Sequence, residues 1–236
     1  MNDVINQIIS YCKQNRVSTT EVADSLNKTG HLVGVKPLNP DFYKVGKVFP
    51  IFTNGGSNYP VHEQIKMAEE GDVVIIFSHG CENLAIIGDI ISKYAIFYKQ
   101  VSAIVVQGAV RDVSRLKRER YPIWSIDYSP IGCSNTPPLQ SFPTDLKDQL
   151  LRKYENSIAV CDDGGVVVIE QDKINSEQLN KLKSIEIQED IWAYCLNSLK
   201  WDTKKIVCDK AYLYEEGSFS ANQIEKIRDI DLNFNS

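Results

Sequence analysis

The chain has 236 residues, of which 43% are hydrophobic and 24% are charged, so it can bury a sizeable core and has the composition of an ordinary globular protein. Its net charge of −5 argues against broad, non-specific binding of nucleic acid. No signal peptide is evident at the start, and no apolar run approaches the ~18 residues of a membrane span. We therefore expect a cytoplasmic protein that acts on neither nucleic acid nor membranes.

The first half of the chain is predicted to alternate helices with strands. Ser18-Thr19-Thr20-Glu21 is a capping-box pattern and predicts the start of a helix that Gly30 ends. Pro50 places its strand at a sheet edge or at a bulge, because proline cannot donate to a strand ladder. The expected elements are helix 4–12, helix 18–26, strand 46–53, helix 62–70, strand 73–77, a short apolar run at 84–87, helix 90–99 and strand 103–106.

The second half adds an antiparallel hairpin to this α/β pattern. Asp162-Asp163-Gly164-Gly165 has the turn chemistry that joins two apolar, β-branched runs. Ser220 and Gln223 form a second capping-box pattern. The expected elements are helix 113–118, strand 123–126, loop 130–143, helix 146–154, strands 158–161 and 166–169, helix 178–199, strand 206–208 and a last helix after Ser220.

The six cysteines are scattered and include no Cys-x-x-Cys pair. In a chain of this length without a signal peptide, this distribution indicates free, buried thiols and not a disulfide framework. The residues are Cys12, Cys81, Cys133, Cys161, Cys195 and Cys208.

The most informative stretch is 103–112. An apolar run there ends in a predicted turn at Gly108, and the turn brings Arg111 and Asp112 side by side at the start of a helix. A strand, a glycine loop and charged residues at a helix start commonly bind ligands at the end of a sheet. The alternative is that Asp112 only caps the helix and Arg111 is a solvated surface charge.

A second candidate stretch is Gly88-Asp89-Ile90-Ile91. A helix start preceded by glycine presents unpaired N–H groups and a partial positive charge, which suit a carboxylate or a phosphate. If strands 73–77 and 103–106 are neighbours, the loops at their C-terminal ends converge. Arg111 would then face an anion bound by these amides, and Asp112 would bind a divalent cation.

These residues carry a family resemblance. The chain resembles the RraA-like family (regulator of ribonuclease activity A), which includes the 4-hydroxy-4-methyl-2-oxoglutarate aldolases, over roughly 20–195. The stretches concerned are Glu69-Glu70-Gly71-Asp72-Val73-Val74-Ile75, Gly88-Asp89, Val106-Gln107-Gly108-Ala109-Val110-Arg111-Asp112 and the hairpin 158–169.

The resemblance implies a swivelling β/β/α domain in residues 1–199, with helices at its N-terminus and a C-terminal extension at 200–236. It also implies a trimer or hexamer with active sites between subunits. The implied activity is that of a divalent-metal (class II) aldolase, or lyase, which cleaves 4-hydroxy-2-oxo acids to pyruvate, often with oxaloacetate decarboxylation. Magnesium is the implied metal, with manganese as the alternative.

Residue by residue, the resemblance makes Asp112 the metal ligand and Arg111 the substrate-binding arginine. It makes the amides of Gly88, Asp89, Ile90 and Ile91 the group that binds the pyruvyl carboxylate. Asp89 or Arg111 would polarise the water that removes the proton from the 4-hydroxyl group. The competing hypothesis is a non-catalytic, protein-binding regulator of the same fold; an aspartate after the arginine favours catalysis, because regulators often lack it.

Two other groups of polar residues have simpler explanations. His79 follows a predicted strand and is a candidate for the pocket lining, but a lone loop histidine is more often structural or solvated. Asp162 and Asp163 are candidate ligands, although a turn explains them better.

Overall fold

The computed structural model describes residues 2–234, which form two compact units, one that ends at Ile174 and one that begins at Asn175. The sequence analysis placed the division after residue 199. The structure places it before helix α7 (Ser176–Asn197), because α7 packs against α8 (Ala221–Phe234) in the second unit.

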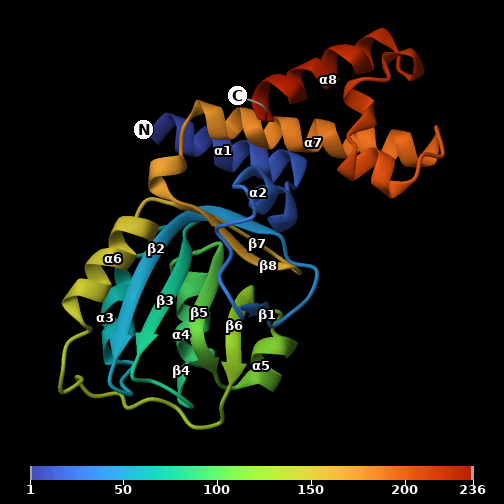
Figure 1. The fold of residues 1–236 in the computed structure, drawn as a ribbon. Coiled ribbons are helices and arrows are strands. Elements are labelled where there is room, and N and C mark those ends of the chain that lie inside the picture. Colours follow the sequence, from blue (N-terminus) through green and yellow to red (C-terminus); the bar gives the residue numbers. More distant parts are fainter. Residues whose placement is uncertain (1, 235–236) are drawn as a thin grey trace. The chain divides into compact units, whose positions relative to one another are not determined.

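The first unit is built on one sheet of eight strands in the order β1-β6-β5-β3-β2-β7-β8, with β4 paired to β5 beyond the end of β3 (Figure 1). The strands β2, β3, β5 and β6 are parallel to one another, and β4 is parallel to β5. The remaining pairs are antiparallel. The strands are β1 (Lys36–Pro37), β2 (Lys44–Asn54), β3 (Val73–His79), β4 (Ala85–Ile87), β5 (Ala103–Val110), β6 (Ile123–Tyr128), β7 (Ile158–Asp162) and β8 (Gly165–Ile169).

Both faces of the parallel sheet are buried, which explains the continuous apolar runs in the sequence. Along β3, Val74 and Ile76 belong to one core, whereas Val73, Ile75 and Phe77 belong to the core on the opposite face. Side chains alternate across a strand, so a strand covered on both sides needs apolar residues at every position.

Helices from different parts of the sequence fill these two cores. The first core contains residues of α3 (Tyr59–Gln64), α4 (Asp89–Lys93), the π-helical turn η2 (Tyr94–Tyr98) and α5 (Val113–Arg118). The second contains residues of α6 (Thr144–Tyr154) and of the β7–β8 hairpin. Helices α1 (Asn2–Asn15) and α2 (Thr19–Ser25) contact β2 and the hairpin, respectively.

Several local predictions are confirmed. The Ser18–Glu21 capping box forms with both of its hydrogen bonds, and Ser220 and Gln223 form the second one. The 162–165 turn joins β7 to β8 as expected. Pro50 lies in the part of β2 that pairs with β3 alone, since β7 pairs with β2 only over Lys44–Lys47. The strand is therefore open on one side at Pro50.

Two elements differ from the sequence analysis. Strand β5 continues through Gly108 to Val110, with an irregular register between Val106 and Ala109 against β6, where a turn was expected. Pairing with β4 on one side and β6 on the other holds this segment extended, and Gly108 fits because a Cβ there would lie 2.5 Å from Ile86 Cδ1. The expected strand at 206–208 is wrong: Lys204–Cys208 is a π-helical turn in a unit of helices alone among its described residues.

The second unit has its own apolar core. Side chains from α7, from the short helical turns at 204–218 and from α8 meet there, and Gln188 Nε2 donates to the hydroxyl of the buried Tyr212 at 3.0 Å. The core residues are Ile191, Cys195, Ile206, Tyr212, Phe219, Ile227 and Ile230.

All six cysteines are free thiols, as predicted; five of them are buried and Cys208 is exposed. Among residues 2–234, no helix has both the length and the apolar character needed to cross a bilayer.

The close approach of β2 to the turn before β3 yields a stability prediction. A Cβ at Gly46 would collide with the carbonyl oxygen of Gly71, a backbone atom that cannot rotate away. Gly46→Ala is therefore expected to lower the free energy of unfolding by about 1–3 kcal/mol, measured by urea denaturation. Gly217→Ala is the control, because a Cβ at Gly217 meets no atom within 4 Å; equal losses in both variants would contradict the prediction.

Candidate active site

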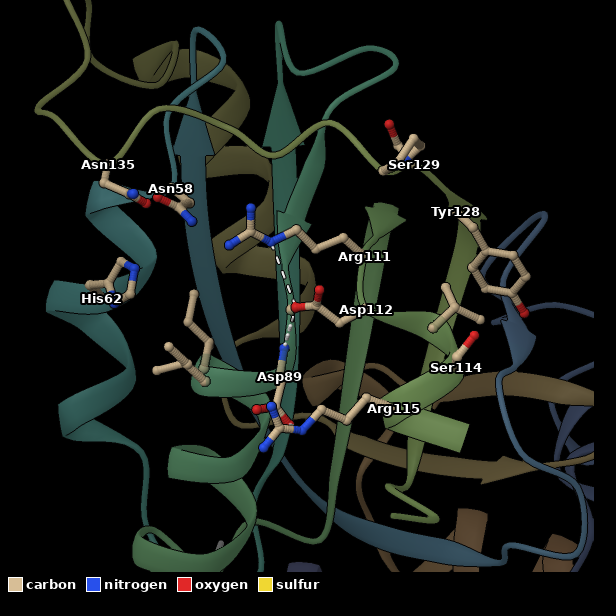
Figure 2. Close-up of a pocket in the computed structure, with 15 residues that line it drawn as sticks. Asn58, His62, Asp89, Arg111, Asp112, Ser114, Arg115, Tyr128, Ser129 and Asn135 are labelled. Atoms are coloured by element: carbon tan, nitrogen blue, oxygen red, sulfur yellow. Dashed lines mark hydrogen bonds and ion pairs between the residues drawn. The ribbon is translucent and has the colours of Figure 1, made fainter. Parts of the chain in front are cut away.

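A cavity of about 830 Å³ opens at the C-terminal ends of β4 and β5. Its walls come from Asn58 and His62, from 88–91, from 111–115, and from 128–130 with Asn135, so it contains both stretches that the family resemblance selected. Figure 2 shows Arg111 and Asp112 between Asp89 on one side and Asn58 with Asn135 on the other.

Parallel strand pairing brings the two candidate stretches together. Strand β5 pairs with β3 and, further along, with β4, and the Arg111 N–H donates to the Ile87 carbonyl at 3.0 Å. The next contact is between side chain and backbone: the Asp89 N–H donates to Asp112 Oδ2 at 3.0 Å. The expected convergence of the two loops is therefore present.

Asp112 occupies the N-cap position of α5, but its side chain does not cap the helix. Its backbone is left-handed (φ 58°, ψ 27°), a conformation that aspartate and asparagine tolerate better than most residues. The carboxylate instead reaches the start of α4 and lies 3.7 Å (Oδ2) from Arg111 Nε. The alternative in which Asp112 is only a helix cap therefore does not describe this geometry.

Two glycines allow the backbone to approach these side chains closely. A Cβ at Gly88 would collide with Asp112 Oδ2 and with the side chain of Arg111. On the opposite side, a Cβ at Gly132 would lie 2.6 Å from Arg111 Nη1. The Arg111 side chain is therefore confined between two segments that cannot carry a side chain without displacing it.

Asp89 is buried and forms an ion pair that the sequence analysis did not predict. Arg115 Nε lies 3.3 Å from Asp89 Oδ1, in a geometry that makes no hydrogen bond, and Oδ1 is otherwise buried without a partner. Burial, and to a lesser extent the charge of Asp89, raises the pKa of the neighbouring Tyr121, which therefore stays a neutral phenol. The Asp89 carboxylate is therefore buried, and the guanidinium of Arg115 on α5 balances its charge.

The amides at 88–91 are only partly available to a ligand. The Asp89 N–H already donates to Asp112, whereas the N–H groups of Ile90 and Ile91 have no acceptor within the described chain. The Ile90 side chain is 77% exposed and the Ile91 side chain is buried. The Asp89 amide is therefore already engaged, whereas the amides of Ile90 and Ile91 remain open to an anion.

The donor set fits a magnesium ion that shares its ligands with a substrate. Within residues 2–234 no group of three or more His, Cys, Asp or Glu side chains could hold a metal by itself. Asp112 is 44% exposed at its side chain and faces the cavity. Magnesium commonly takes one or two carboxylates and completes its six ligands with water and substrate oxygens, so one exposed carboxylate is sufficient.

The far wall of the cavity was missed in the sequence analysis. Asn58 and His62 come from the start of α3, and Asn135 comes from the long loop at 130–143. Asn58 Oδ1 is buried without a hydrogen-bond partner among the described residues. No local motif marks these residues, because they come from two segments distant in the chain, which meet where the Asn58 N–H donates to the Ser134 carbonyl at 2.9 Å and where Ser57 bridges to Ser134.

The remaining candidates have structural roles. His79 does not line the cavity, and its Nδ1 is 2.9 Å from Asn54 Oδ1. The Asp162 carboxylate accepts hydrogen bonds from Thr19 and Gly164, and that of Asp163 accepts from the Asp41 N–H. The explanation of Asp162 and Asp163 as turn residues is therefore confirmed.

Comparison with known proteins adds a family and a set of relatives. Residues 19–168 match the family model described as "RraA-like: Aldolase/RraA". Protein DlpA of Legionella pneumophila is 24% identical over 195 residues, 80% of this chain and 31% of DlpA. A protein of Halalkalibacterium halodurans named "Putative 4-hydroxy-4-methyl-2-oxoglutarate aldolase" is 31% identical over 109 residues, 46% of this chain and 51% of that protein. The aligned chain thus spans about a third and about half of these relatives.

A solved structure shares the fold. Streptomyces coelicolor RraAS2, described as an unusual member of the RNase ES inhibitor RraA protein family, superposes with a TM-score of 0.59 at 21% identity. The superposition covers 78% of this chain and 92% of that one. At this identity the likeness concerns the fold alone.

Because the backbone of Asp112 is left-handed, two substitutions at this position can separate its contribution to stability from any chemical role. Asp112→Asn keeps a residue that tolerates this conformation and an oxygen that can accept from Asp89 N–H, so stability should barely change. Asp112→Ala loses both and is expected to lower the free energy of unfolding by about 2 kcal/mol. Urea denaturation of the two variants checks this. An asparagine variant as unstable as the alanine variant would contradict it.

Proposed function

The chain belongs to the RraA-like family, and from that premise we propose that it is a divalent-metal-dependent aldolase that cleaves a 4-hydroxy-2-oxo acid and releases pyruvate. The observation that carries the proposal is the orientation of Asp112. Its carboxylate faces the cavity beside Arg111, whereas a helix cap would have pointed it at the first turn of α5.

Arg111 and the start of α4 are suited to binding the 2-oxo acid end of the substrate. A guanidinium binds a carboxylate through two parallel hydrogen bonds, and the free amides of Ile90 and Ile91 add donors on the same side of the cavity. Because Arg111 is confined by Gly88 and Gly132, its charge is already in place when negative charge develops on the substrate. A fixed cation stabilises such charge better than one that must first reorient.

Asp112 would hold the metal, with water and the substrate oxygens completing its ligands. When bound, a magnesium or manganese ion would supply Lewis-acid polarisation of the 2-oxo group. The same site would account for decarboxylation of oxaloacetate, since both reactions leave negative charge on the carbon next to the 2-oxo group.

Asp89 is the proposed group for the proton step. Asp89 lines the cavity with 9% of its side chain exposed, and its buried Oδ1 atom makes no hydrogen bond, so the carboxylate has spare capacity as an acceptor. A water held by Asp89 would take the proton of the 4-hydroxyl group as the C3–C4 bond breaks. The Arg115 guanidinium, whose Nε atom lies 3.3 Å from Asp89 Oδ1, balances the charge of Asp89.

A second candidate function is a non-catalytic, protein-binding regulator. The specific observation in its favour is a strip of exposed apolar side chains that begins at the cavity with Ile90 and continues along α4 and η2; Ile90, Phe97 and Tyr98 are 77%, 58% and 73% exposed. Pyruvate release from a 4-hydroxy-2-oxo acid, measured with and without magnesium, separates the two functions. A protein with no turnover under either condition would favour the regulator.

The aldolase proposal predicts a loss of turnover without a loss of folding. Asp112→Asn should lower magnesium-dependent pyruvate release by about a hundredfold or more, roughly 3 kcal/mol in the barrier, because an amide does not hold a dication as a carboxylate does. Asp163→Asn, the same change at the hairpin turn, is the control and should keep wild-type turnover. Wild-type turnover in Asp112→Asn would eliminate the proposal.

Arg111→Lys should also lose activity in this assay, because an ammonium cannot reproduce the two-pronged contact of a guanidinium with a carboxylate. Arg118→Lys is the matched control, since Arg118 is 72% exposed at its side chain and does not line the cavity.

The exposed apolar strip also supports a homo-oligomer, and we expect a trimer or a hexamer. A second copy that covered the strip would remove apolar surface from water next to the cavity. Light scattering at micromolar concentration should give the mass of three or six chains. Tyr98→Glu should shift the protein toward monomers, whereas Tyr214→Glu, an equally exposed position in the second unit, should not. A stable wild-type monomer would contradict this expectation.

A further inference from the structure

A second groove adjoins the candidate active site, between α3 and α4. It has a volume of about 420 Å³ and shares His62, Ile90 and Ile91 with the lining of the cavity. Figure 2 shows His62 on α3, across from the start of α4. Pockets that bind small molecules have volumes of roughly 300–1,000 Å³, so the groove is large enough for part of a substrate. Its other lining residues are Tyr59, Glu63, Ile65, Lys66 and Tyr94.

The wall on the α3 side is fixed by the side chain of Gln64. Its Nε2 donates to the Phe52 carbonyl at 2.8 Å, and its Oε1 accepts from the Phe52 N–H at 3.2 Å. The amide thus pairs with the backbone of β2 much as a neighbouring strand would. It thereby anchors the helix that carries Tyr59 and His62.

The wall on the α4 side is fixed by different contacts. The Ser92 hydroxyl donates to the Gly88 carbonyl at 2.8 Å at the start of the helix. At its end, the ring of Tyr94 stacks on that of Tyr98, with 5.8 Å between the ring centroids. Because each wall is held separately, the groove is preformed.

The lining of the groove is mainly apolar. Ile65 and Ile91 are buried and form its floor, whereas Ile90 and Tyr94 are exposed and stand at its rim. Tyr59 adds a second aromatic ring on the α3 side. Ligand sites typically combine such an apolar lining with a few polar groups that fix the orientation of the ligand.

The charges of the lining favour an uncharged group in the groove. Of the two arginines that line the cavity, Arg115 lies 3.3 Å from Asp89 Oδ1, so Arg111 is left to bind the carboxylate of a 2-oxo acid. In the groove itself, the charge of Lys66 is offset by that of Glu63. A carboxylate placed there would lose part of its hydration beside another carboxylate, which is unfavourable.

We propose that the groove is the subsite for the substituent on C4 of the substrate, and that this substituent is an apolar group, aliphatic or aromatic. The inference rests on the proposed aldolase function, which places the 2-oxo acid end at Arg111 and Asp112. Ile90 and Ile91 line both the cavity beside these residues and the groove, so the two ends of one substrate can occupy both. Burial of the apolar substituent then adds to affinity in proportion to the area removed from water.

The same arrangement assigns a place to each product. When the C3–C4 bond breaks, its electron pair stays on C3, and the 4-hydroxyl proton passes to the water held by Asp89. C4 becomes the carbonyl carbon of an apolar aldehyde, which leaves from the groove. C3 then takes up a proton to give pyruvate in the cavity.

The groove is distinct from the rest of the exposed apolar strip. Phe97 and Tyr98 do not line it. A subunit contact on Phe97 and Tyr98 is therefore compatible with a groove that stays open to a substrate.

The first experiment compares two 2-oxo acids that lack the 4-hydroxyl group and so cannot undergo the aldol cleavage. 2-Oxo-4-phenylbutanoate carries a phenyl group on C4, and 2-oxoglutarate carries a carboxylate there. Calorimetry with the full chain and magnesium should show the phenyl compound binding about tenfold more tightly or better. Equal affinities would overturn the proposal. Tighter binding of 2-oxoglutarate, abolished in Lys66→Gln, would show an anionic subsite and would also overturn it.

Variants of Tyr94 test the groove itself. Tyr94→Ala should weaken binding of 2-oxo-4-phenylbutanoate by about tenfold and leave that of pyruvate unchanged, because pyruvate ends at C3. Tyr94→Arg should reverse the preference, since a guanidinium would pair with the carboxylate of 2-oxoglutarate. Tyr214→Ala, at an exposed tyrosine of the second unit, is the control and should bind all three acids as the wild type does. Equal losses for pyruvate and the phenyl compound in Tyr94→Ala would contradict a separate subsite.

Light scattering of Tyr94→Ala tests whether a second copy of the chain fills the groove instead. We expect the mass of the wild-type assembly. A smaller mass, together with weaker binding of both pyruvate and the phenyl compound, would assign the groove to a subunit contact and overturn the proposal.

Turnover separates this inference from the proposed function. If both hold, kcat/KM for pyruvate release from 4-hydroxy-2-oxo-4-phenylbutanoate should exceed that from 4-hydroxy-2-oxoglutarate by about tenfold or more. Preferential binding of the phenyl compound by a protein that cleaves neither substrate would refute the aldolase and leave the subsite. Faster cleavage of 4-hydroxy-2-oxoglutarate, without a preference in binding, would refute the subsite and leave the aldolase.

Discussion

The hydrogen bond from the Asp89 N–H to Asp112 Oδ2 joins the ends of two parallel strands and fixes the geometry of the cavity. It forms only because Gly88 has no side chain, since a Cβ there would occupy the position of the carboxylate oxygen. The same contact holds Asp112 away from the first turn of its own helix and places Arg111 between two backbone segments. The close approach of Gly88 to Asp112 therefore determines the positions of the Asp112 carboxylate and the Arg111 guanidinium.

The two walls of the cavity have different origins. The wall at Gly88–Ile91 and 111–115 comes from consecutive parts of one parallel sheet, where strand pairing sets the distances. The wall at Asn58, His62 and Asn135 depends on the long loop 130–143, which is held by bridges to Ser57 and Ala85 and by hydrogen bonds from the side chains of Asn54 and Ser57 to its carbonyl groups. Because Gly132 in this loop packs on the Arg111 guanidinium, the loop connects the two walls.

The family contains proteins described as aldolases and as ribonuclease inhibitors, and this chain has features that suit each description. The buried Asp89 with its partner Arg115, and the exposed Asp112 beside a confined Arg111, are arrangements of charge that a packing surface does not need. The exposed apolar strip on α4 and η2 is what a protein interface needs. If neighbouring subunits covered the strip, the apolar strip would hold the assembly together and the charged residues would line its cavity.

The sequence by itself determined most of the elements, because the periodicity of apolar residues, the capping boxes and the Asp-Gly turn are local signals. It also indicated Arg111, Asp112 and Gly88–Ile91, since a strand end followed by a helix start is visible in one stretch. The tertiary structure alone decided that β5 runs through Gly108, because pairing with β4 and β6 outweighs the preference of glycine for a turn. It likewise decided that Arg115 pairs with Asp89, and that Asn58 and His62 line the same cavity as Arg111. Each of these arrangements joins residues distant in the chain, and no local pattern encodes such contacts.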